Sequence, residues 1–198
     1  MKNIFLLVAL LIMVLGAFPG VARADFYTGA VTMDHGYLYW WQINGLSIPS
    51  GAVISSATLT VQGIGNWALE QNKLWIHLLD TAGTSAGFSR GAWDGQEPAP
   101  FTDGLGSSGT FLVAYTNLPY PGTTDQVLPF SPGQLTALAS YINNGGNIAF
   151  GFDPDCHFNV SDIRFAMTST PVPEPTSIAL LGTCLLLSWG ALRRKLRA

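Results

Sequence analysis

Apolar and polar residues alternate along most of the chain between Asp25 and Thr170, with the period of two that is typical of half-buried β-strands. The clearest case runs from Ile54 to Gln62, where alternate residues are apolar and the residues between them carry hydroxyl or amide groups. The same pattern, bounded by turns rich in Gly, Pro, Asn and Asp, predicts six further strands: Phe26–Met33, Tyr37–Asn44, Lys73–Asp80, Thr110–Thr116, Asn147–Asp153 and Val160–Thr168. Seven such strands are enough for two packed antiparallel sheets, so the pattern predicts an all-β sandwich.

Two segments of this region depart from the alternating pattern. Ser131 can cap a helix and Pro132 suits its first turn, while Gly145 can end it. The apolar residues between them fall at i, i+3, i+4 and i+7: Leu135, Leu138, Ala139 and Ile142. The residues from Arg90 to Ser108 are rich in Gly, Pro and Asp and predict a long surface loop. The sandwich is therefore expected to contain one short helix.

The first 24 residues have the three parts of a secretory signal. Lys2 supplies the charge, the run from Ile4 to Phe18 is apolar, and Ala22-Arg23-Ala24 has small residues where a signal peptidase requires them. The apolar run is shorter than a bilayer span requires, which favours a removable signal peptide over a retained anchor. Residues 1–24 are therefore predicted to be removed, and the chain is expected to be exported.

A second apolar segment lies near the C-terminus. Residues 171–175 are rich in proline, which keeps a chain extended and suits a spacer. Residues 176–192 contain no charged side chain and would form a helix about 26 Å long, enough for a single transmembrane helix. The basic cluster in residues 193–197 marks the cytoplasmic side. The body, residues 25–170, is thus expected to stay outside the membrane.

The C-terminal arrangement of Pro173-Glu174-Pro175, an apolar segment and a terminal arginine cluster closely resembles the PEP-CTERM sorting signal of exopolysaccharide-producing bacteria. This resemblance covers residues 171–198 and implies that Pro173, Glu174 and Pro175 form the sorting motif. It also implies recognition by exosortase, a transpeptidase-like membrane protease, which converts an inner-membrane-anchored precursor into a protein of the cell surface or extracellular matrix. A membrane anchor that is never processed is the alternative.

The body has a second resemblance. Residues Ile43–Val61, with Ile-Pro-Ser-Gly at their centre, look like a stretch of exported jelly-roll modules that include the DNRLRE group of carbohydrate-associated domains. The predicted helix followed by Asn144-Gly-Gly-Asn-Ile-Ala-Phe-Gly-Phe is similar too. The name-giving DNRLRE motif is absent, so the resemblance implies a jelly-roll-like sandwich and does not identify a ligand.

The charge of the body argues against nucleic acid as a partner. Residues 25–170 contain three basic residues, Lys73, Arg90 and Arg164, against eleven acidic ones, a formal net charge of −8, although the whole chain carries only −3. Such a field repels phosphate backbones. Export permits disulfides, but Cys184 lies in the apolar tail and cannot readily meet Cys156. Cys156 is either a buried small residue or a thiol that pairs with another chain.

Three carboxylates surround the connection between the last two predicted strands. Asp153, Asp155 and Asp162 supply hard oxygen ligands of the kind that bind Ca²⁺, which is the one cofactor that the sequence suggests. An ordinary solvated turn is the alternative, because Asp and Pro favour turns for backbone reasons alone.

Aromatic residues offer a candidate surface for sugar rings. In the strand that starts at Tyr37, one face carries Tyr37, Tyr39, Trp41 and Ile43. Because the aliphatic Ile43 continues this row of aromatic residues, the face is predicted to belong to the core. Trp40 lies on the other face and is the better glycan-binding candidate of this strand. Trp67 and Trp93 fall in predicted loops or strand ends and are further glycan-binding candidates, with core packing as their alternative.

No residue pattern predicts catalysis. Cys156 and His157 are sequence neighbours without the signatures of cysteine proteases. Asp153 and Asp155 fall in one predicted turn, whereas glycosidase carboxylates face each other across a cleft. No catalytic residue is assigned, and we expect a non-enzymatic structural or glycan-binding protein associated with exopolysaccharide. A polysaccharide-modifying enzyme, a lyase or hydrolase on the same jelly-roll scaffold, is the alternative.

Overall fold

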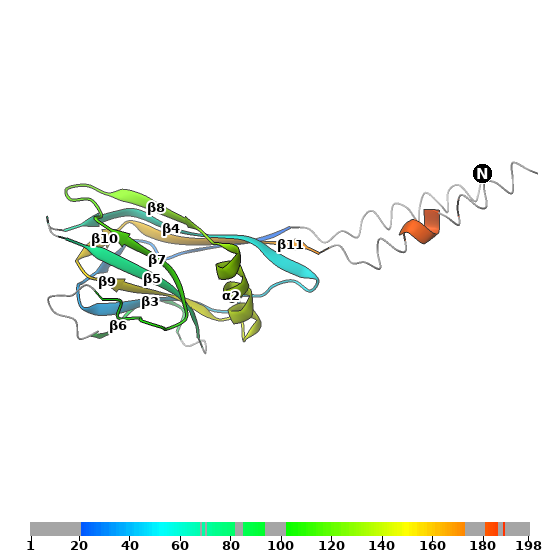
Figure 1. Ribbon diagram of the computed structural model, residues 1–198, viewed down its shortest axis with the longest axis horizontal. Coiled ribbons are helices and arrows are strands. Elements are labelled where there is room, and N and C mark those ends of the chain that lie inside the picture. Colours follow the sequence, from blue (N-terminus) through cyan, green and yellow to red (C-terminus); the bar gives the residue numbers. More distant parts are fainter. Residues whose placement is uncertain are drawn as a thin grey trace, which may run out of the picture.

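The alternating segments form two antiparallel sheets that pack face to face (Figure 1). The computed structural model describes residues 21–67, 69, 71–81, 85–93, 102–172, 181–185 and 188. The first sheet contains β1 (Ala22–Tyr27), β2 (Val31–Met33), β4 (Ala52–Asn66), β8 (Thr124–Pro129), β10 (Phe158–Val160) and β11 (Asp162–Pro171). The second contains β3 (Tyr37–Ile43), β5 (Lys73–Asp80), β6 (Gly87–Trp93), β7 (Thr110–Thr116) and β9 (Ile148–Pro154). The predicted two-sheet antiparallel sandwich is confirmed.

Strands distant in sequence are neighbours in both sheets. The first sheet has the order β1-β11-β4-β10-β2, with β8 on the other side of β4, and the second has the order β6-β3-β9-β5-β7. β4 is the centre of the first sheet, because β11, β10 and β8 all pair with it. β9 holds the same place in the second sheet, between β3 and β5.

Two of the predicted strands are each divided in the structure. The segment Phe26–Met33 becomes β1 and β2, which are separated at Gly29, where φ is +75°. The segment Val160–Thr168 becomes β10 and β11, which are separated at Ser161. The amide of Ser161 donates to the carbonyl of Gln62, next to Gly63 of β4, where φ is +58°. Both divisions therefore occur beside a glycine with positive φ, a conformation that interrupts regular strand geometry.

The predicted loop from Arg90 to Ser108 is wrong at its start. Arg90 to Trp93 belong to β6, an edge strand that pairs with β3, and residues 94–101 lie outside the described part. β6 was missed because its sequence, Gly-Phe-Ser-Arg-Gly-Ala-Trp, has two glycines and little apolar alternation. β8 was missed as well, because it is an edge strand that ends in proline.

The predicted helix is α2 (Pro132–Asn143), and its start is a capping box. The backbone amide of Gln134 donates to the hydroxyl of Ser131, and the amide of Ser131 donates to the side-chain oxygen of Gln134. Leu138 and Ile142 are its buried residues, as the spacing predicts. The helix contacts strands of both sheets and so covers one end of the core (Figure 1).

The core lies between the inner faces of the sheets. Three of the four residues in the predicted core row of β3, Tyr39, Trp41 and Ile43, are each less than 5 % exposed, whereas Tyr37 is only partly buried. An aromatic cluster joins the sheets at the centre and comprises Trp41, Phe130, Phe150 and Phe165. Aliphatic residues fill the space around this cluster, so the body has one continuous core.

The two chain ends leave the sandwich at the same end. β1 and β11 are antiparallel neighbours, with Ala22 opposite Ser169, and the helical residues 181–185 lie beyond that end (Figure 1). We call this the proximal end and the opposite one the distal end. The predicted cleavage motif, residues 22–24, forms the start of β1, while residues 1–20 lie outside the described part.

Most of the predicted transmembrane segment, residues 176–192, also lies outside the described part, as do Pro173, Glu174 and Pro175. Within the residues that the structure describes, no helix has the length and apolar character needed to cross a bilayer.

Candidate functional site

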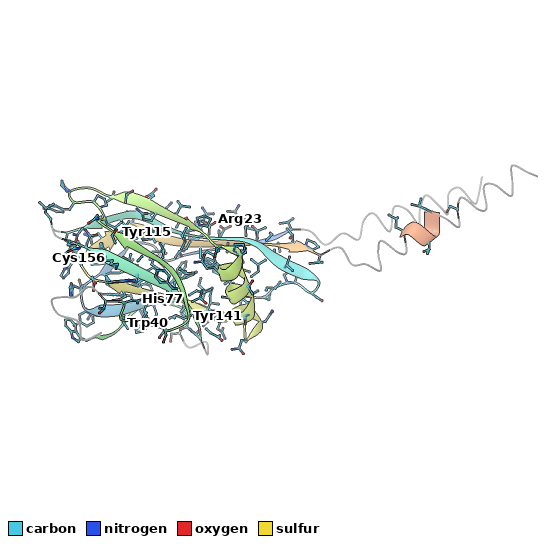
Figure 2. The ribbon with its side chains drawn as sticks, viewed as in Figure 1. Arg23, Trp40, His77, Tyr115, Tyr141 and Cys156 are labelled. Carbon is cyan, nitrogen blue, oxygen red and sulfur yellow. The ribbon has the colours of Figure 1, made fainter. Side chains whose placement is uncertain are left out.

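The distal end carries a row of five aromatic and imidazole rings: Trp67, His157, His35, Trp93 and Tyr37. We call this row the aromatic strip. Its members come from the end of β4, the β9–β10 connection, the β2–β3 turn, the end of β6 and the start of β3. The strip therefore draws on both sheets. Cys156, next to His157, lies at the end of the sandwich remote from Arg23 of β1 (Figure 2).

The first half of the strip is a stacked pair. The backbone amide of Trp67 donates to the carbonyl of His157 at 3.1 Å, which fixes the two residues beside each other. Their rings then stack with centroids 5.1 Å apart and planes inclined by 29°. Trp67 remains 45 % exposed. This indole is held in place on one side and exposed on the other. It therefore offers an apolar surface to a ligand, and binding costs little side-chain entropy.

The two histidines lie beside each other, and Gly36, under the indole of Trp93, follows His35 in the chain. The ring centroids of His35 and His157 are 6.4 Å apart, with an interplanar angle of 35°. His35 lies in the turn that leads from the first sheet to the second, and His157 lies in the connection that returns from the second to the first. The strip consequently runs across the gap between the sheets.

The second half of the strip is formed by Trp93 and Tyr37. Their rings meet edge to face, with centroids 5.1 Å apart and planes at 82°. The indole of Trp93 lies directly over Gly36, where a Cβ atom would overlap it and where φ is +75°. Only glycine suits that turn for both reasons. Trp93 is 48 % exposed, so this half of the strip also presents an open indole.

A charged pair borders this half of the strip. The Arg90 guanidinium lies 4.5 Å from the ring centroid of Tyr37 and 3.5 Å from the carboxylate of Asp34. The backbone amide of Asp34 donates to the hydroxyl of Tyr39 at 2.7 Å. Burial raises the pKa of Tyr39 above its ordinary value, so this phenol stays neutral and holds the turn in place. Hydrogen-bonding groups thus lie beside the apolar rings.

A second set of hydrogen bonds holds the backbone next to Trp67 against the β7–β8 loop. The backbone amide of Asn66 donates to the carbonyl of Pro119 at 3.0 Å. The side chain of Asn72 binds both backbone groups of Leu118, accepting from its amide at 2.7 Å and donating to its carbonyl at 3.0 Å. The β7–β8 loop is therefore fixed under the end of β4, which positions the indole that follows.

The three predicted glycan-binding tryptophans do not form one site. Trp67 and Trp93 belong to different halves of the aromatic strip. Trp40 lies on the outer face of β3, partly buried against Gly91 of the neighbouring strand, and is not part of the strip (Figure 2). The histidines were missed because each is a lone residue in a turn, and only the pairing of distant strands brings them together.

The three predicted calcium ligands are not brought together either. Asp153 is fully buried in β9, where it accepts a hydrogen bond from the amide of Gly104. Asp162 belongs to the other sheet and accepts from the amide of Gly29 at 2.8 Å. Asp155 is also buried, and among the described residues no three His, Cys, Asp or Glu side chains form a group that could hold a metal ion. The structure thus provides no calcium group from these residues.

Two other reactive side chains are enclosed. Cys156 is 1 % exposed and its thiol donates to the side-chain oxygen of Asn66 at 2.8 Å, which confirms the buried alternative for this residue. His77 is also 1 % exposed, and both of its ring nitrogens are engaged at 2.8 Å, one with Asp103 and one with the carbonyl of Ser108. His77 therefore anchors the 102–109 loop on the outer face of the second sheet and is not open to a ligand.

Comparison with known proteins identifies the tail. Residues 171–195 match the family model of the PEP-CTERM protein-sorting motif. The matched residues include Pro173, Glu174 and Pro175, on which the resemblance was based. The body, residues 25–170, lies outside the match. No curated protein matches the chain.

Proposed function

Because the chain carries a PEP-CTERM sorting motif, which marks it for export through a membrane-anchored precursor and for processing by exosortase, we propose that its body is a non-enzymatic glycan-binding domain. It acts at the cell surface or in the exopolysaccharide matrix, and it binds through the aromatic strip. The motif supports the location, and the geometry of the distal end supports the activity.

The observation that carries this proposal is the pair of half-exposed indoles, Trp67 and Trp93, in one row at the distal end. Each indole is supported on one side, Trp67 by His157 and Trp93 by Gly36 and Tyr37, and keeps about half of its surface open. Each can therefore stack with one sugar ring, while Arg90 and the histidines reach hydroxyl or carboxylate groups of the glycan.

The exposure of the indoles sets the scale of the affinity. About half of a side chain that buries up to ~250 Å² leaves roughly 120 Å² open, of which a sugar covers about half. At ~25 cal/mol per Å², each indole then contributes about 1.5 kcal/mol, or roughly tenfold in Kd. Two indoles together therefore predict a moderate affinity for one site on the glycan. A polymer that repeats this site would bind more tightly overall, because its weak contacts act together.

The enclosed state of Cys156 and His77 supports binding without turnover. The His77–Asp103 pair anchors a loop, and the thiol of Cys156 is buried and faces Asn66. Neither has the access to solvent that a nucleophile or a general base needs to reach a polymeric substrate.

The test uses the exported protein and a panel of hexasaccharides from cellulose, laminarin and alginate, together with the exopolysaccharide of the producing cells. Calorimetry measures binding, and assays for new reducing ends and for unsaturated sugars measure turnover. We expect binding to at least one polymer without turnover. The combined variant Trp67→Ala/Trp93→Ala should lose about a hundredfold in affinity, since distant sites add. Phe111→Ala, which removes a 51 % exposed aromatic residue from β7, is the matched control and should bind as the unaltered protein does.

Each contrary result is informative. Binding that survives the combined variant would assign the glycan to another surface. New reducing ends or unsaturated sugars would favour the alternative, a hydrolase or lyase. No binding to any polymer in the panel would leave a purely structural role in the matrix.

A further inference from the structure

The sorting motif begins directly where the folded body ends. β11 stays paired through Pro171, which lies opposite Ala52 of β4. The next residue, Val172, donates its backbone amide to the carbonyl of Gly51 at 2.7 Å. Pro173, the first residue of the motif, follows immediately. We call the four residues Gly51, Ala52, Pro171 and Val172 the tail clamp.

The tail clamp leaves little room for an enzyme. Pro175 is three residues beyond Val172, and even a fully extended chain covers at most about 10–11 Å over that interval. That distance is similar to the ~10 Å spacing of the two packed sheets. A protease that grips the chain on both sides of Pro173-Glu174-Pro175 would therefore overlap the proximal end of the body while the clamp is closed.

The end of β11 is built so that it can open locally. A shift of register between Thr168 and Ser169 separates the last residues of the strand from its buried middle part. Pro171 has no amide to donate, and Val53 and Val172 are each about half exposed. Ile163 and Phe165, by contrast, are fully buried. Opening of the clamp breaks few contacts and leaves the core intact, as in sub-global openings generally.

We propose that the tail clamp is the surface that exosortase meets on this protein, and that its opening admits the enzyme to the sorting motif. Gly51 and Ala52, at the start of β4, move away from β11, and the freed residues of β11 give the enzyme the extended chain it needs. This inference rests on the sorting motif and is independent of glycan binding.

The test locks the clamp in the full chain, in its producing cells. Residues directly opposite each other in an antiparallel pair have Cα atoms roughly 4.5–5.5 Å apart, within the range for a disulfide. The variant Ala52→Cys/Pro171→Cys, in a Cys184→Ser background, is therefore expected to form a disulfide after export. The matched control, Thr58→Cys/Ala166→Cys in the same background, joins the same two strands at a registered pair outside the clamp.

Immunoblots with an epitope in the body give the ratio of precursor to processed protein, and mass spectrometry identifies the new C-terminus. We expect the clamp disulfide to lower the processed fraction at least tenfold, a reducing agent in the medium to restore it, and the control disulfide to leave it unchanged. Processing of the oxidised clamp variant at the unaltered rate would overturn the proposal.

A second variant separates a blocked clamp from a misfolded body. Inserting Gly-Ser-Gly-Ser between Val172 and Pro173 adds up to about 13 Å of reach. The insertion should restore processing of the oxidised clamp variant, because the motif then lies clear of the body. If the insertion does not restore processing, the disulfide acts by some route other than the clamp, and the proposal is wrong.

Discussion

Replacing Asn72 by alanine tests how the distal end is held. Asn72 is 4 % exposed and Leu118, whose amide and carbonyl it binds, is 5 % exposed. The substitution removes two hydrogen bonds, each contributing about 1 kcal/mol net, and it also leaves a buried amide and a buried carbonyl without these partners. A cost of about 1.5 kcal/mol for each of the two orphaned groups, which already includes its lost hydrogen bond, makes the expected loss about 3 kcal/mol.

Such a loss is a large part of the 5–15 kcal/mol that a domain of this size typically has. It should lower Tm by about 6–12 °C, at roughly 2–4 °C per kcal/mol. The measurement is thermal and urea unfolding of the exported protein. Asn159→Ala is the control, because its side chain binds Thr32 at the surface and should contribute less than about 0.5 kcal/mol.

The same variant also has a functional readout. Asn72 does not belong to the aromatic strip, but the loop that it holds accepts the hydrogen bond from Asn66, the residue before Trp67. Glycan affinity should therefore fall together with stability, although Asn72 contacts no ligand. A loss below about 1 kcal/mol would refute the reasoning, because it would mean that the backbone groups of Leu118 find other partners.

Two further predictions concern packing and charge. Gly91→Ala should destabilise the body by about 1–3 kcal/mol, because the new Cβ in β6 would overlap the indole of Trp40. The control Gly133→Ala places a Cβ in open space on α2 and should leave Tm unchanged or slightly higher. Equal Tm values for the two variants would contradict this prediction. The hydrogen bonds of Arg23 and then of Arg164 lower the pKa of Asp25, so the stability that this carboxylate contributes is present above its ordinary pKa and is lost as the pH falls through the lowered value. In a chain that retains residue 23, Arg23→Gln should raise the Asp25 titration midpoint measured by NMR, and an unchanged midpoint would argue that Arg164 alone sets it.

The elements that the sequence predicts best are those whose signals are local. β5 and β7 begin and end where the alternation does, and α2 starts at Ser131 because the capping box needs only residues three positions apart. β6 and β8 carry no such signal. Their backbones are ordered by pairing with β3 and β4, which are far away in the chain, so a reading of their own residues could not find them.

The candidate site shows the same division. Trp67 and Trp93 could be singled out as aromatic residues in turns or strand ends, but their common row depends on the pairing of Asn66 with Phe158 and of Trp93 with Tyr37. Asp153 was interpreted as part of a turn because of the proline after it. In the structure β9 continues through Pro154, and the 102–109 loop covers the carboxylate of Asp153. This loop is distant in sequence, so the residues around Asp153 could not predict the contact.

The antiparallel pairing of the first strand with the last gives this molecule two poles. Any reporter or bead joined to the chain at Val172 would sit at one pole, while Trp67 and Trp93 face outward from the other. A layer of copies grafted in this way would present all of its indoles in one direction. The handle and the recognition surface could then be engineered separately.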